Sequence, residues 1–214
     1  MNHDAPAYGP WTLVIFNSAI FLMFAVSFFK AQTARDWRTF GAFAAFIVAL
    51  FGEMYGFPLT LYLMSGWLQT RFPGIDLLSH NSGHLWSTLL GEKGNSQFGV
   101  LHIAIYVFLG FGFYRLSSAW NVLYRAQRRD ASAKAGLYAR IRHPQYVAFV
   151  LILLGFLLQW PTLLTLVMFP FLLIMYARLA ITEEAEMRKR FGGEFENYAA
   201  PRFVPWLRKA APAQ

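Results

Sequence analysis

The sequence contains no cysteine, which excludes disulfide-stabilised domains, thiolate metal sites and cysteine nucleophiles. Charge is also scarce: Asp, Glu, Lys and Arg make up 14% of the 214 residues, against about 25% in an average soluble domain. Hydrophobic residues account for 57%, so the chain has too few polar side chains to cover a soluble globule of this size. The same counts exclude disordered and collagen-like chains, and we expect a membrane protein.

Four apolar runs approach or exceed the length of about 20 residues that a helix needs to cross a bilayer. They cover residues 11–29, 40–68, 98–116 and 146–180. The last run is too long for one membrane helix and contains the turn signal Gln-Trp-Pro at 159–161, which predicts a tight helical hairpin. The sequence therefore predicts an all-α polytopic membrane protein with about five transmembrane helices.

The basic residues indicate an orientation. Seventeen of the 19 Lys and Arg residues fall before the second run, from the end of the third run to the hairpin, or from the end of the hairpin onward, counting Arg115 and Arg178 at the run ends. With five spans these regions share one side, and the positive-inside rule places the N-terminus outside and the C-terminus in the cytosol. We read the net charge of +8 as a signal for orientation and lipid headgroups, and expect no nucleic-acid partner. The expected location is a bacterial-type inner membrane.

The most informative stretch is GLYARIRHPQY at 136–146, at the expected cytosolic mouth of the hairpin. His143 precedes a proline, which disfavours helical backbone there, and Pro144 suits the first turn of a helix. A helix that begins at this point offers free amide donors to an anionic group, and Arg140 and Arg142 would strengthen such a site. The alternative is a basic juxtamembrane anchor.

A second polar cluster follows the last apolar run. Glu183, Glu184 and Glu186 lie within four positions and would repel one another on a helix unless cations faced them. Arg188 and Arg190 could supply those cations on a solvated helix, which is the alternative interpretation. The pair Gly-Gly at 192–193 is expected to end the helix. The two clusters together offer the carboxylates, arginines and aromatics that suit a cofactor with an amino-acid end, a positive centre and an adenine ring.

The two motifs, GLYARIRHPQY and EEAEMRKRFGGEFENYAAPRF, flank a hydrophobic hairpin and resemble the family of isoprenylcysteine carboxyl methyltransferases and phospholipid N-methyltransferases. The resemblance covers residues 120–203 and implies an α-helical, membrane-embedded enzyme. It further implies that S-adenosylmethionine is held between the cytosolic ends of the last helices and leaves as S-adenosylhomocysteine. Carried over residue by residue, the motifs fall on Gly136, Tyr138, Arg142, His143, Pro144, Tyr146, Glu183, Glu184, Phe191, Gly192, Phe195, Tyr198 and Arg202.

Within that resemblance we predict the cofactor-binding residues to be Tyr138, Arg142, His143, Pro144, Tyr146, Glu183, Glu184, Tyr198 and Arg202. Arg142 and Glu184 are also predicted to be catalytic. Glu53 is added as a third catalytic candidate because it is the one acidic residue inside an apolar run, and intramembrane carboxylates are costly and often functional. The alternative for Glu53 is a glutamate paired inside the bundle with Asn, Tyr or a backbone group.

The predicted organisation has two parts. Residues 98–214 form the methyltransferase core, and residues 1–97 form transmembrane segments and an outer loop on the acceptor side. The acceptor is a small or lipid-like carboxylate, amine or thiol, and the other partners are membrane lipids, with no obligate protein partner. Asp76, His80 and His84 have zinc-compatible spacing, but we favour an interfacial amphipathic helix there and expect no metal. Two other functions stay open: a sterol-type reductase that uses NADPH, and a non-enzymatic lipid-binding protein.

Overall fold

The computed structural model describes residues 8–28, 33–71, 73–74, 86 and 100–196. Within these residues the regular structure is helical and no strand occurs, so the all-α expectation is confirmed. The elements in chain order are α1 (Trp11–Phe28), α2 (Ala34–Phe51), the π-helical segment η1 (Gly52–Gly56), α3 (Leu59–Arg71), α5 (Val100–Arg128), the 3-10 turn η4 (Gly136–Ala139), α6 (Pro144–Gln159) and α7 (Leu163–Glu196).

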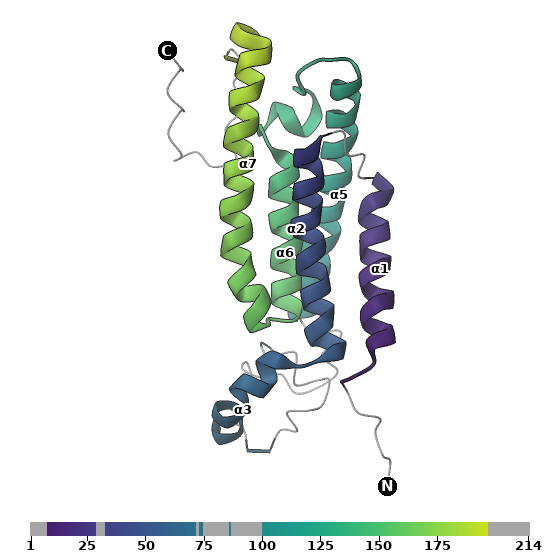
Figure 1. Cartoon of the computed structure of the whole chain (residues 1–214), viewed down its shortest axis with the longest axis vertical. Helices are drawn as coiled ribbons and strands as arrows, with labels where there is room; N and C mark the ends of the chain where they lie inside the picture. The colour runs from purple at the N-terminus through teal and green to yellow at the C-terminus, as the bar shows by residue number, and fades with distance from the viewer. Residues whose placement is uncertain (1–7, 29–32, 72, 75–85, 87–99, 197–214) are drawn as a thin grey trace.

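The helices α1, α2, α5, α6 and α7 run side by side along the long axis of the molecule (Figure 1). Among the described residues, three helical stretches are long and apolar enough to cross a membrane: Ala34–Gly56, His102–Arg128 and Leu163–Gly193. Trp11–Ser27 and Pro144–Gln159 are shorter apolar helices. These lengths agree with an integral membrane protein, while the number of five spans and the orientation stay predictions.

The apolar run at 40–68 does not form one continuous helix. The helix α2 passes into η1 and ends at Phe57, whose backbone is extended (φ −117°, ψ 115°). Pro58 explains the break, because a proline disfavours helical backbone in the residue before it. The chain then turns into α3, which lies beyond the lower end of the bundle (Figure 1).

The helical hairpin predicted around residues 159–161 is present. Helix α6 ends at Gln159 and α7 begins at Leu163. Thr162 starts α7 because its hydroxyl accepts the Thr165 amide at 3.0 Å, as an N-cap does. Helix α6 has 16 residues, so it is about 24 Å long at 1.5 Å per residue, shorter than the ~30 Å hydrocarbon core.

Helices α5 and α6 pack closely because glycine faces the neighbouring helix on each side. A Cβ at Gly112 would lie 2.7 Å from Ile152 Cγ1, and a Cβ at Gly155 would lie 2.9 Å from Leu109 Cδ2. Side chains larger than hydrogen would force the helices apart. This contact fixes α6 in the bundle, with its first turn at the end where α2 begins and α7 ends. We call this end of the bundle the basic end (top of Figure 1).

Candidate functional site

The first wall of the site is the loop that leads into α6. Gly136 has a positive φ of 59°, which glycine adopts without strain, and starts η4. His143 precedes the helix with non-helical backbone (φ −131°, ψ 63°), and Pro144 occupies the first turn. The helix start that the His-Pro pair predicted is therefore observed, and Tyr138, His143, Pro144 and Tyr146 are all buried at the basic end.

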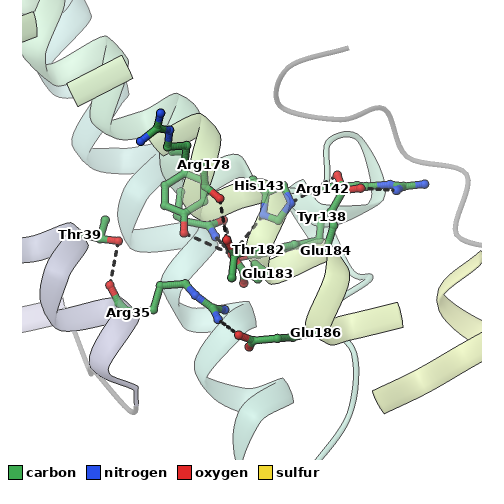
Figure 2. Close-up of polar contacts among 12 residues, drawn as sticks. Arg35, Thr39, Tyr138, Arg142, His143, Arg178, Thr182, Glu183, Glu184 and Glu186 are labelled. Carbon is green, nitrogen blue, oxygen red and sulfur yellow. Dashed lines mark hydrogen bonds and ion pairs between the residues drawn. The ribbon is translucent and has the colours of Figure 1, made fainter. Parts of the chain in front are cut away.

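The second wall is the part of α7 that continues past the apolar run. Glu183 lies opposite the first turn of α6, and its side chain is 12% exposed. Its Oε2 accepts a hydrogen bond from the Tyr146 hydroxyl at 3.3 Å and one from Gln145 Nε2 at 3.5 Å. The Nδ1 of His143 lies 3.3 Å from the same oxygen. The Glu183 carboxylate thus contacts three side chains at the start of α6. Figure 2 shows its contact with His143.

Glu184, the next residue, binds the other side of the loop. Its Oε2 forms an ion pair with Arg142 Nη1 at 3.1 Å, and its Oε1 lies 3.6 Å from His143 Nε2. The guanidinium of Arg142 also lies over the Phe195 ring, 5.3 Å from its centroid. Phe195 reaches this position because the helical path breaks at Gly192 (φ 47°, ψ −128°), which is where the glycine pair predicted a break.

His143 stands between the two glutamates. Burial lowers the pKa of its imidazole, but contact with the carboxylates of Glu183 and Glu184 raises it by more, so the net pKa lies above the usual value of 6.5. Neither ring nitrogen makes a hydrogen bond of good geometry with another described residue. Charge attraction to the two carboxylates, one facing each ring nitrogen, therefore holds the buried imidazole in place.

Aromatic rings form the floor of the site. The rings of His143 and Tyr146 stack with centroids 5.6 Å apart, and Tyr146 stacks on Tyr176 at the same distance. The Tyr138 hydroxyl donates to Gln145 Oε1 at 2.8 Å, which orients the Gln145 amide toward Glu183. These stacked aromatic rings lie next to the ion pairs of Glu183 and Glu184. Such a combination suits a ligand that carries both a flat ring and charged groups.

Sequence reasoning missed two residues of this cluster. Gln145 is the variable position of the Arg-His-Pro-x-Tyr motif, and a buried polar residue in the first turn of an apolar helix was the available signal. Arg35 was assigned only to the orientation pattern. The structure places it at the start of α2, where its guanidinium pairs with Glu186 of α7 (Figure 2). A residue from the first 97 positions therefore borders the site.

Glu53 lies away from the other predicted site residues that the structure describes. It lies in η1 at the opposite end of α2 from Arg35, is 5% exposed, and its Oε2 accepts the Thr60 amide at 3.0 Å and the Thr60 hydroxyl at 2.5 Å. The same hydroxyl accepts the Leu163 amide at 2.7 Å. These contacts match the alternative of a glutamate paired inside the bundle, and we leave Glu53 out of the proposed active site.

The remaining predicted residues fall outside the part that the structure describes. They are Tyr198 and Arg202 after α7, and Asp76, His80 and His84 of the outer loop.

Comparison with known proteins gives one match. The phospholipid methyltransferase family model matches residues 95–194, which include both walls of the site. No curated protein and no solved structure matches the chain significantly. The match confirms the resemblance drawn from the two motifs, and it covers the whole first motif and residues 183–194 of the second. The matched residues, just under half of the chain, are thus similar to phospholipid methyltransferases, and this match supports a membrane methyltransferase.

Proposed function

We propose that the protein transfers a methyl group from S-adenosylmethionine to a small or lipid-like acceptor at the cytosolic face of a bacterial-type inner membrane. The observation that carries this proposal is the meeting of the two motifs. Glu183 and Glu184 of α7 contact Tyr146, His143 and Arg142 at the start of α6. The loop that leads into α6 and the end of α7 therefore form one polar site at the end of the helical hairpin.

The residues present fit this cofactor by their chemistry. An arginine suits its carboxylate, buried glutamates suit its ammonium, and tyrosine rings suit its base and its sulfonium. Glu184 and the Phe195 ring hold the guanidinium of Arg142 in a fixed position at the site.

When bound, S-adenosylmethionine supplies an activated methyl group on a positively charged sulfur. The protein then has to hold the acceptor in line with that group and keep water out, and orientation alone is worth about 7–11 kcal/mol in well-aligned reactions. Glu184 fixes Arg142, and Tyr146 fixes Glu183, so each charged side chain that would touch the cofactor is preorganised by a neighbour. Tyr198 and Arg202 are proposed to complete the site, as the resemblance implies.

The acceptor is a carboxylate, an amine or a thiol. A carboxylate or a thiolate reacts without a base, whereas an ammonium must first lose a proton. Neither a reductase nor a purely lipid-binding role is favoured by an observation at the site.

Calorimetry with S-adenosylhomocysteine on the detergent-solubilised protein tests the proposal. We expect binding to the wild type and its loss in Arg142→Ala. Arg190→Ala is the matched control, because Arg190 also pairs with an acidic residue at the basic end, Asp130, but both side chains are exposed. Equal affinity in wild type and Arg142→Ala, or equal loss in both variants, would contradict the assignment.

A further inference from the structure

Arg35 differs from the other basic residues at the start of α2. Thr33 and Asp36 form a capping box that fixes the first turn of the helix, and the Thr39 hydroxyl donates to the Arg35 carbonyl at 3.0 Å. The side chain of Arg35 is only 19% exposed and points toward α7 (Figure 2). Arg38, one turn further along, is exposed. The fold therefore directs the Arg35 guanidinium from α2 toward Glu186 of α7.

The direct partner of Arg35 is a weak one. Glu186 is 59% exposed, and an ion pair with a solvent-exposed partner contributes little to stability. Because the Glu186 side chain is mostly exposed, its carboxylate can rotate away into solvent at small cost. The Arg35 guanidinium could then bind another group. Glu186 thus occupies a position where another oxyanion could bind.

Arg35 is also part of the electrostatics of the site. It interacts with Glu183 and with Tyr146, the two residues that join the walls of the site. An anionic group on Arg35 would therefore lie next to the proposed methyl-transfer centre. It would approach from α2, on a different side from Arg142 of the α6 loop.

The position of Arg35 along the helix matches the depth of lipid headgroups. The span Ala34–Gly56 begins one residue before it, and Trp37 beside it is exposed, as tryptophans at membrane interfaces are. Arginine binds phosphate and carboxylate with two parallel hydrogen bonds, which lysine cannot do. A lipid-like molecule between α2 and α7 would present its headgroup oxyanion to this fork.

We propose that Arg35 is a specificity-determining residue that binds the oxyanion of the methyl acceptor, a phosphodiester or a carboxylate, in exchange for Glu186. This inference rests on the proposed methyltransferase function and deepens it. It limits the acceptor to lipid-like molecules that carry a negative group near the methylated atom. It also gives the N-terminal half of the chain a direct part in acceptor binding.

Equilibrium binding of two short-chain probes, measured with S-adenosylhomocysteine bound, tests the inference. Dihexanoylphosphatidylethanolamine presents a phosphodiester, a farnesylated N-acetylcysteine presents a carboxylate, and dihexanoylglycerol is the neutral control. We expect the wild type to bind one of the two anionic probes more tightly than the neutral one, and the better probe names the oxyanion. Arg35→Gln should weaken that binding about tenfold or more, as loss of a charge-assisted bidentate contact does. Arg38→Gln should leave it unchanged.

Two further variants separate recognition from folding. Glu186→Gln removes the competing carboxylate and should tighten binding of the same probe, and Arg35→Lys should recover only part of the lost affinity. The affinity for S-adenosylhomocysteine should stay the same in Arg38→Gln, and Arg35→Gln should weaken it much less than it weakens probe binding.

The inference is overturned if the wild type binds neither anionic probe better than the neutral one, or if Arg35→Gln and Arg38→Gln have equal effects. It is also overturned if Glu186→Gln fails to tighten binding of the probe. The same holds if Arg35→Gln lowers the affinity for S-adenosylhomocysteine as much as it lowers the affinity for the probe. Failure of the wild type to bind S-adenosylhomocysteine would instead reject the proposed function.

Discussion

The hydroxyl of Tyr146 donates a hydrogen bond to Glu183 Oε2 over 3.3 Å, across 37 residues of sequence. The contact exists because α6 and α7 form a hairpin that returns the chain to the end where α6 began. The first residues of α6 and the last residues of α7 are therefore neighbours, and the chemistry of both motifs converges there.

Loss of this hydroxyl should weaken cofactor binding. Tyr146→Phe keeps the ring stack on Tyr176 but removes a donor to a buried carboxylate, and hydrogen bonds to charged groups contribute about 1.5–3 kcal/mol. We expect roughly tenfold weaker binding of S-adenosylhomocysteine by calorimetry. Tyr176→Phe is the matched control, because the Tyr176 hydroxyl is buried without a hydrogen-bond partner among the described residues. Equal affinities of the two variants would show that the Tyr146 hydroxyl does not organise the site.

The bend at Gly192 should be required for the position of Phe195. The backbone there (φ 47°, ψ −128°) is one that L-residues rarely adopt, so Gly192→Ala is strained although nothing lies near the added methyl group. We expect Phe195 to leave the Arg142 guanidinium and the affinity for S-adenosylhomocysteine to fall several-fold.

Gly193→Ala serves as the comparison for that variant. The methyl group at Gly193 also meets open space, but φ there is not positive. Its affinity and melting temperature should match the wild type, and a loss equal to that of Gly192→Ala would mean that the bend is not the cause.

Most of the helical fold was predictable from local patterns, because each pattern has a local physical cause. Apolar runs near the bilayer thickness predicted the long helices, and a proline after His143 predicted the start of α6. The glycine at 192 predicted the break in α7. The end of α2 was harder: Pro58 was visible, but whether the helix continued beyond it depended on where the bundle ends.

The residues of the site that sequence reasoning missed depend on contacts between distant segments. Arg35 and Glu186 are 151 positions apart, and no local pattern shows that the start of α2 lies beside the end of α7. The position of Glu53 relative to the site also depends on distant contacts. Glu53 was proposed as catalytic because burying a carboxylate is costly. Its distance from the site has another cause: Arg35 lies in the first turn of α2, and Glu53 lies in η1, which follows the other end of that helix.

Glu53 should therefore matter for stability more than for methyl transfer. It joins η1 to α3 through Thr60, and Thr60 in turn accepts the first amide of α7. We expect Thr60→Val to lower the melting temperature, since it leaves a buried carboxylate and an amide with fewer partners. Glu53→Gln should keep the wild-type rate of methyl transfer. A large loss of rate in Glu53→Gln with an unchanged melting temperature would return Glu53 to the catalytic residues.

The contribution of His143 to stability should decrease as the pH rises. Because the folded protein raises the pKa of His143 above 6.5, the protonated imidazole between two glutamates is favoured by folding. This stabilisation is complete below about pH 6.5 and is lost as the pH rises through the folded pKa. The difference in melting temperature between wild type and His143→Gln should be largest near pH 6 and shrink at alkaline pH. A difference that grows with pH would contradict the assigned charge.

The most direct measurement of the central claim is transfer of a radiolabelled methyl group from S-adenosylmethionine. Purified protein in vesicles of total bacterial lipid, supplemented with prenylated and small thiol acceptors, should label one acceptor class. Glu184→Gln, which keeps the size of the side chain but weakens its hold on Arg142, should reduce labelling at least about tenfold. Labelling that is equal in wild type and Glu184→Gln, or absent from the wild type with every acceptor, would contradict a methyl-transfer site built from these two helix ends.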